Sequence, residues 1–240
     1  MKTIAIFILS AFAMTFAVSG AHASLQGRDL DGDTSTFEAW YDPASNLTWL
    51  ADANYAQTSG YDADGKMDWH KADVWAAQLN INGYDNWRLP KVSPLNGVAM
   101  NYTVSYDGST DASYNYTSLS KEMAYLFHVT LGNASRYDTT GAVSGCYVVD
   151  VDHCFDHQGP FTNLEFPYFY WNDAAYAPTP AEAWAAVLDR GSFGTQTTNQ
   201  EHRAWVVSDG DVGAVPEPET YVFFLTGLGM IAWGIKQRAR

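Results

Sequence analysis

The chain of 240 residues has an apolar segment near each end and an aromatic-rich, mixed stretch between them. Residues 4–18 are mostly apolar, and residues 221–235 form an uncharged apolar run. Between them, short apolar clusters are separated by Gly, Asn, Asp and Ser, which is typical of short strands joined by turns. We therefore set the two ends aside as targeting segments and interpret residues 24–214 as one domain.

Two helices are predicted within this domain. The first covers residues 69–79, because Asp68 suits an N-cap and apolar side chains follow at helical spacing. These side chains are Ala72, Trp75, Ala76 and Leu79. The second helix covers residues 119–131 and ends at Gly132.

Short strands are predicted on either side of these helices. Residues 37–49 read as two strands around a turn, and residues 159–171 are aromatic and extended. Residues 179–188 have two possible interpretations, the start of a helix or a strand, and we favour the strand. A loop over residues 191–201 and a strand over residues 204–207 would follow. The predicted fold class is α+β, with two helices, short antiparallel strands and long loops.

The N-terminus has the pattern of a signal peptide. Lys2 gives a positive start, the apolar run follows, and Ala21-His22-Ala23 matches a cleavage site. We expect residues 1–23 to be removed after Ala23, so that the mature chain starts at Ser24.

The C-terminus combines a proline motif, a short apolar run and a basic end. The apolar run has 15 residues, fewer than the roughly 20 that usually span a bilayer. The cations after it favour a cytoplasmic end. A plain membrane anchor is one interpretation. The motif residues are Val215, Pro216, Glu217 and Pro218, and the basic residues are Lys236, Arg238 and Arg240.

This order of features resembles the PEP-CTERM sorting signal of Gram-negative bacteria. The resemblance implies that residues 215–240 include a short transmembrane helix and are recognised by an exosortase. It also implies cleavage near Pro216-Glu217-Pro218, so that an inner-membrane intermediate becomes a protein released from or attached to the cell surface. Such tails usually belong to bacteria that make extracellular polysaccharide.

The charge of the domain excludes one class of partner. Residues 24–214 keep 25 of the 27 acidic and 9 of the 13 basic residues, a net charge near −16. Such a surface repels nucleic acid and other anionic polymers, and no basic stripe offsets it. We therefore expect no nucleic-acid partner.

Cys146 and Cys154 are the two cysteines of the chain. In an exported protein we expect them to form a disulfide. The alternative is zinc, because His153 and His157 lie close by in the sequence, although the spacing matches no standard zinc motif.

Two acidic loops are candidates for calcium binding, because carboxylates at alternate positions offer hard oxygen ligands. A solvated acidic turn is the alternative for each loop. The first loop has Asp29, Asp31 and Asp33, with Glu38 nearby, and the second has Asp62, Asp64 and Asp68.

Signatures of catalysis are weak. The chain has no G-x-S-x-G or H-E-x-x-H motif, and its isolated histidines at positions 70, 128 and 202 are typical of structural or exposed sites. We expect the protein not to be an enzyme.

The sequence Gly83-Tyr-Asp-Asn-Trp-Arg-Leu-Pro90, with Leu47-Thr-Trp-Leu50 before it, resembles the Lcl C-terminal domain family, and the similarity extends from Thr36 to Gly213. The resemblance implies a C-type-lectin-like fold. Many members carry cysteines on the first helix, where this chain has Gln78, so their disulfides do not transfer. Within the motif, we expect Trp87 and Leu89 to fill the core, Arg88 to tie loops together, and Pro90 to end a strand.

These observations favour a surface or matrix protein that binds or scaffolds extracellular polysaccharide, with exposed aromatic rings stacked on sugars. An enzyme that modifies extracellular polysaccharide and a structural envelope protein without a ligand remain alternatives.

Overall fold

The computed structural model describes residues 24–148, 151–152, 154–167 and 169–213. The predicted signal peptide and sorting segment lie outside the described residues. Within the described part of the chain, no helix has the length and apolar character needed to cross a bilayer.

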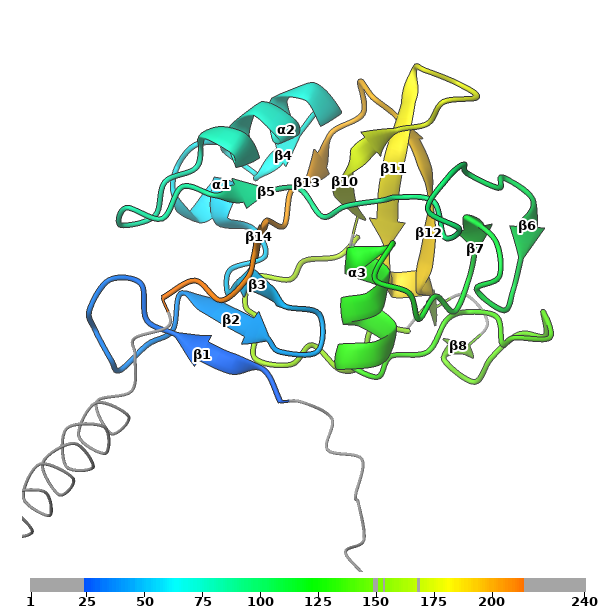
Figure 1. Cartoon of the computed structure of the whole chain (residues 1–240), viewed down its shortest axis with the longest axis horizontal. Coiled ribbons are helices and arrows are strands. Elements are labelled where there is room, and N and C mark those ends of the chain that lie inside the picture. Colours follow the sequence, from blue (N-terminus) through cyan, green and yellow to red (C-terminus); the bar gives the residue numbers. More distant parts are fainter. Residues whose placement is uncertain (1–23, 149–150, 153, 168, 214–240) are drawn as a thin grey trace, which may run out of the picture.

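One five-stranded antiparallel sheet joins the two ends of the domain (Figure 1). β14 lies between β3 and β5, so the end of the domain pairs with strands near its start. The predicted turn is confirmed, because β2 and β3 form a hairpin in which Trp40 pairs with Trp49. In sheet order the strands are β1 (Gln26–Arg28), β2 (Ala39–Asp42), β3 (Leu47–Leu50), β14 (Val207–Asp209) and β5 (Trp87–Arg88).

A second five-stranded sheet forms the other half of the domain. Its neighbours are antiparallel except for β10 and β13, which are parallel. In sheet order the strands are β12 (Ser192–Thr197), β11 (Glu182–Val187), β10 (Phe169–Ala175), β13 (His202–Arg203) and β4 (Lys66–Met67). Smaller pairs are formed by β6 (Val104–Ser105) with β7 (Ala112–Ser113), and by β8 (Tyr147–Val148) with β9 (Val151–Asp152).

The first predicted helix is confirmed. α2 (Trp69–Gln78) begins after Asp68, whose carboxylate accepts a hydrogen bond from the Lys71 N–H. The second helix starts three residues later than predicted, as α3 (Glu122–Tyr125), and continues as a π-helical turn, η1 (Leu126–Thr130). Two short elements complete the set, α1 (Tyr55–Thr58) and η2 (Leu188–Arg190).

The strand predictions near the C-terminal end are partly wrong. Residues 182–187 form β11, so the strand is correct and the helix start is not. The loop predicted over residues 191–201 contains β12, whose pairing with β11 outweighs its loop-like Gly and Thr composition. Residues 204–207 belong to a strand only at Val207, because this buried segment carries the chain from β13 in one sheet to β14 in the other.

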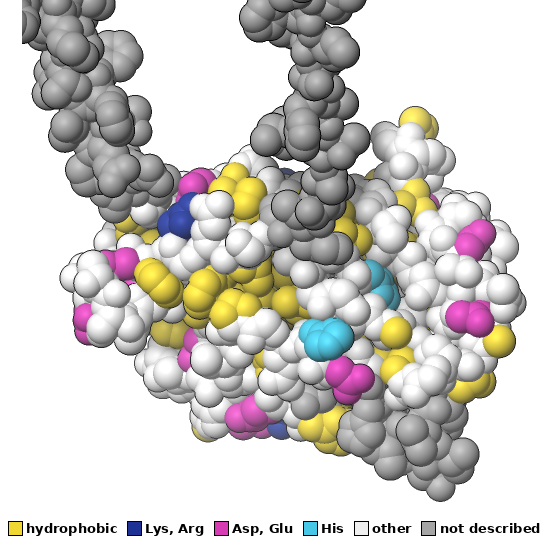
Figure 2. Space-filling view, turned by 90° about the horizontal axis from the view of Figure 1, so that it is seen from below, with side chains coloured by type: hydrophobic (Ala, Val, Ile, Leu, Met, Phe, Trp, Pro, Cys, Tyr) yellow, Lys and Arg dark blue, Asp and Glu magenta, His cyan; other side chains and the backbone are white. Residues whose placement is uncertain are grey.

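Two hydrophobic clusters form the core of the domain. One gathers α3 and η1 around Trp205 and Tyr170, and the other packs α2 against Trp171 and Trp87. Apolar side chains packed at the border of the first cluster are only partly buried. Figure 2 shows hydrophobic side chains gathered on the lower face of the molecule, with acidic side chains mainly around them.

Candidate functional site

Two surface cavities meet at Phe169 on the second sheet. The register places Phe169, Val187 and Ser192 side by side on β10, β11 and β12. Because both cavities share Phe169, we call them together the Phe169 groove. The first, about 340 Å³, is lined by Val104, Ala112, Ser113, Tyr114, Phe169, Val187, Arg190, Ser192, Phe193, Gly194 and Gln196. The second, about 290 Å³, is lined by Lys66, Pro167, Phe169, Glu201, His202 and Arg203.

The ring of Phe169 is held by an aromatic stack. It lies parallel to the imidazole of His202, with ring centroids 5.1 Å apart, and that imidazole lies 4.8 Å from Trp171. Burial lowers the pKa of His202 to about 4, and the charge of Lys66 acts in the same direction. The imidazole is therefore neutral near pH 7 and acts as an apolar support for the Phe169 ring.

Polar side chains surround this ring. Arg190 and Glu201 are exposed, and Gln196 and Ser192 are partly exposed on β12. Lys66 is fixed by an ion pair with Asp64 at 3.0 Å, and the buried Arg203 donates to Glu165 at 2.6 Å. An aromatic surface with hydrogen-bonding groups at its edge is the usual construction of a small-molecule or sugar site.

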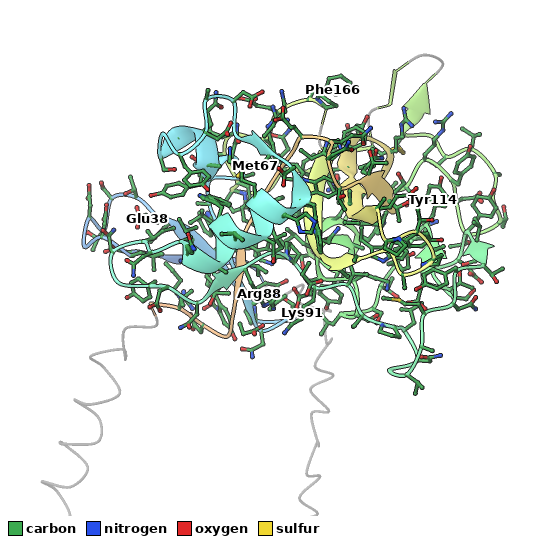
Figure 3. The ribbon with its side chains drawn as sticks, turned by 90° about the horizontal axis from the view of Figure 1, so that it is seen from above. Glu38, Met67, Arg88, Lys91, Tyr114 and Phe166 are labelled. Atoms are coloured by element: carbon green, nitrogen blue, oxygen red, sulfur yellow. A yellow bond between two sulfur atoms is a disulfide. The ribbon has the colours of Figure 1, made fainter. Side chains whose placement is uncertain are left out.

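A tyrosine cluster extends the first cavity. Tyr114 stacks on Tyr106 with centroids 5.6 Å apart, and Tyr137 lies edge-on to both. In Figure 3, Tyr114 lies at the opposite end of the molecule from Glu38. The groove and the first acidic loop are therefore separate features.

The Trp87-Arg88-Leu89-Pro90 motif contributes two side chains, Trp87 and Leu89, to the hydrophobic cluster around α2. Trp87 and Leu89 are buried, and β5 ends at Arg88. The Arg88 guanidinium donates to both carboxylate oxygens of Glu122, at 2.7 and 2.9 Å, and also to Asp209. Burial opposes the charge, yet these hydrogen bonds raise the pKa of Arg88 above its usual range. The motif joins β5, α3 and β14, and Figure 3 shows Arg88 beside Lys91.

The structure separates the two acidic loops. Asp29, Asp31 and Glu38 bring carboxylate oxygens within 4.8 Å of one another, although Asp33 is outside this group. Such a set of oxygen ligands fits a calcium ion. Within the described residues, the first loop is thus the better candidate of the two for calcium binding.

The carboxylates of the second loop have other partners. Asp62 pairs with Lys71 at 2.5 Å, and Asp64 pairs with Lys66. Asp68 caps α2. These three side chains do not form a joint group among the described residues.

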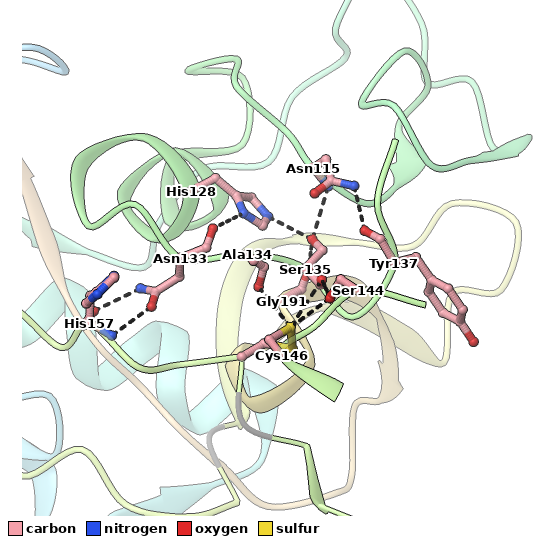
Figure 4. The surroundings of a disulfide bond; sticks show 11 residues. Asn115, His128, Asn133, Ala134, Ser135, Tyr137, Ser144, Cys146, His157 and Gly191 are labelled. Atoms are coloured by element: carbon pink, nitrogen blue, oxygen red, sulfur yellow. Dashed lines mark hydrogen bonds between the residues drawn. A yellow bond between two sulfur atoms is a disulfide. The ribbon is translucent and has the colours of Figure 1, made fainter. Parts of the chain in front are cut away.

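The predicted disulfide between Cys146 and Cys154 is confirmed. Both sulfurs are bonded to each other, so the zinc alternative is wrong. Figure 4 shows the bonds around it: Ser135 donates to the carbonyl of Gly191 at 2.7 Å and contacts His128 Nε2 at 3.3 Å. Burial lowers the pKa of His128 to about 4, so this histidine is a neutral packing residue.

The Phe169 groove is not predicted from the sequence. Its local signal is the aromatic segment 159–171, which predicts extended chain but no binding surface. The sorting residues, Ala23 and Val215-Pro216-Glu217-Pro218, lie outside the described residues.

The chain matches the model of a known protein family. The family model of the Lcl C-terminal domain matches residues 38–208, which include both sheets except β1 and the last residue of β14. No curated protein and no solved structure matches the chain. The Phe169 groove lies wholly within the matched segment.

Proposed function

The chain belongs to the Lcl C-terminal domain family, and from this premise we propose that it is an extracellular polysaccharide-binding protein that uses the Phe169 groove. Family membership indicates an exported, extracellular or surface protein. We further propose that its mixed fold is C-type-lectin-like, and that its ends are a signal peptide and an exosortase sorting signal. The sorted protein would pass through the inner membrane of a Gram-negative bacterium to the cell surface or matrix.

The observation that carries the binding proposal is the position of Phe169. One aromatic ring borders two cavities, is supported from beneath by His202, and is surrounded by hydrogen-bonding side chains. Sugar rings present apolar C–H faces and hydroxyl edges, so this combination matches their chemistry. In this proposal a linear sugar chain lies across the ring, with one sugar unit in each of the two cavities.

We propose binding without catalysis. Hydrolysis of a glycosidic bond ordinarily uses two carboxyl groups that flank it. Among the described residues that line the groove, Glu201 is the one carboxylate. Asp173 and Glu122 are held elsewhere by backbone or arginine hydrogen bonds. The negative charge of the domain also supports a proposal that nucleic acid is not a partner.

The test is retention of the purified full chain on extracellular polysaccharide from the cells that produce it, with a glycan array as a second readout. We expect Phe169→Ala to lose binding. Phe37→Ala is the control, since Phe37 is 46 % exposed but lies beside β1 and β2. Absence of binding by the unmodified protein to both materials would contradict the proposal.

A further inference from the structure

Lys121 and Asp111 form an ion pair that is closed off from solvent. Lys121 Nζ lies 2.9 Å from Asp111 Oδ1, and each side chain is 2 % exposed. Transfer of two charges from water to such a site carries a large desolvation cost for each ion. A neutral product formed from the same two groups would remove that cost.

The Asp111 carboxyl is held for attack by backbone donors. The Leu95 N–H donates to Oδ1 at 2.9 Å, and the Asn101 N–H donates to Oδ2 at 2.8 Å. Lys121 Nζ is fixed from the other side, because it also donates to the Ser93 carbonyl at 2.7 Å. A nucleophile and an electrophile fixed at contact distance have a very high effective concentration.

The two members of the pair differ in their surroundings: apolar groups lie against the Lys121 amine, whereas, although burial opposes this shift, hydrogen bonds keep the pKa of Asp111 below its usual range. Nζ lies 5.4 Å from the centre of the Trp184 ring and 3.7 Å from the sulfur of Met100. Burial lowers the pKa of Lys121, although the Asp111 carboxylate opposes this shift. A lowered pKa increases the fraction of neutral amine, which is the form that attacks a carboxyl carbon.

A third carboxyl, Asp173, is near enough for its negative charge to act on Lys121, where it raises the pKa of the amine. Asp173 Oδ1 accepts a hydrogen bond from the Val92 N–H at 2.8 Å, and Val92 forms an antiparallel bridge with Lys121. Burial raises the pKa of Asp173 to about 6, so this group can both take up and release a proton near neutral pH.

We propose that Lys121 and Asp111 condense into an intramolecular isopeptide bond, with Asp173 transferring the protons. Nζ attacks Cγ of Asp111, the new Nζ–Cγ bond forms, and the Cγ–Oδ1 bond breaks. Two of the three ammonium hydrogens leave with Oδ1 as one water molecule, and Asp173 ends unchanged. Oδ2 becomes the amide oxygen and still accepts the hydrogen bond from the Asn101 N–H. The remaining Nζ–H still donates to the Ser93 carbonyl.

The bond would anchor an inserted loop. It would join Asp111, beside β7, to the residue directly before α3. Exclusion of water from the site would protect the amide from hydrolysis. Asp111 directly precedes the groove residue Ala112, but neither Asp111 nor Lys121 lines the Phe169 groove. The presence of the bond is therefore tested separately from sugar binding.

The test is digestion of the purified full chain with trypsin after denaturation and reduction. An unlinked chain is cut after Lys91, Lys121 and Arg136, which gives peptides 92–121 and 122–136. We expect the cut after Lys121 to be lost, and one peptide of residues 92–136 to appear that is lighter by one water. Complete cutting after Lys121 would overturn the proposal.

One alternative product and two control variants make the result specific. Loss of water with normal cutting after Lys121 would indicate a cyclic imide at Asp111 and would overturn the isopeptide bond. Lys121→Arg keeps a positive charge beside Asp111, and this variant should be cut at position 121. Asp173→Asn should leave the pair largely unlinked, and full linkage in that variant would overturn the role of Asp173.

Discussion

The ring of Phe169 stacks on the imidazole of His202, with the two planes inclined by 19°. Phe169 comes from β10 and His202 from β13, strands that pair in parallel through Tyr170 and Arg203. This stack fixes the ring that borders both cavities. Loss of the His202 ring should therefore weaken binding even when Phe169 is unchanged.

Substitution of His202 tests that relationship. We expect His202→Ala to weaken glycan binding by about tenfold, because loss of the support costs roughly 1.4 kcal/mol of preorganisation. His202→Phe should retain most of the affinity, since it keeps an aromatic ring beneath Phe169. Equal affinity of His202→Ala and the unmodified protein, by titration calorimetry, would show that the stack has no role in binding.

Acidification should destabilise the domain through His128 and His202. Both have folded-state pKa values of about 4, below the unfolded value near 6.5, so the unfolded chain binds more protons between these limits. Their contribution to stability is complete above about pH 6.5 and is lost as the pH falls toward 4. Asp173 acts in the opposite direction, because burial raises its pKa to about 6.

The measurement is the free energy of unfolding from pH 7 to pH 4. For the more buried His128 the full effect is about 3 kcal/mol. We expect His128→Gln to be less stable than the unmodified protein at pH 7 but to lose less stability on acidification. Parallel pH profiles for the two proteins would contradict this assignment.

Removal of the Arg88 guanidinium should lower the stability of the domain substantially. Glu122 has a side chain that is 8 % exposed and would lose its bidentate partner. We expect Arg88→Ala to lower the free energy of unfolding by about 3 kcal/mol, because a buried charge is left uncompensated. Lys71→Ala removes a more exposed ion pair and should cost less than about 1 kcal/mol. Equal losses in chemical denaturation would contradict the structural role of Arg88.

The disulfide should contribute a moderate amount of stability. It closes a loop with a sequence separation of 8, for which the chain-entropy estimate is about 2.5 kcal/mol. We expect the double variant Cys146→Ser, Cys154→Ser to lose about this much, and Ser144→Ala to lose much less. A reductant should produce the same loss in the unmodified protein and none in the double variant.

Any calcium effect should depend on the first acidic loop alone. Calcium bound to the native state raises the melting temperature by mass action. We expect such a rise to disappear in Asp31→Asn and to persist in Asp64→Asn, because Asp29, Asp31 and Glu38 are the carboxylates that lie together in the part of the chain that the structure describes. Dependence on Asp64 instead would contradict the assignment.

Local features of the fold could be predicted from the sequence. The Asp68 cap and the helical spacing of Trp75 and Ala76 identified α2, and two cysteines in an exported chain identified the disulfide. These predictions succeeded because the helix depends on residues close together in the sequence, and because two cysteines can form one disulfide. The β2–β3 hairpin could also be predicted, because its two strands are adjacent in the sequence.

Features that depend on distant contacts could not be predicted. The Phe169 groove exists because β13 returns beside β10, and β12 is a strand because it pairs with β11. The Lys121–Asp111 pair depends on a loop folding over the start of α3. Neither long-range pairing nor burial of a charged side chain leaves a periodic signal in the sequence.

The central claim is that Phe169 is the sugar-contacting residue of this protein. It is tested most directly by calorimetric titration of the full chain with an oligosaccharide cut from the polysaccharide that it retains. We predict saturable binding that Phe169→Ala weakens by at least about tenfold, a loss of roughly 1.4 kcal/mol, while Phe37→Ala binds like the unmodified protein. Unchanged affinity in Phe169→Ala, or the same loss in Phe37→Ala, would contradict the account.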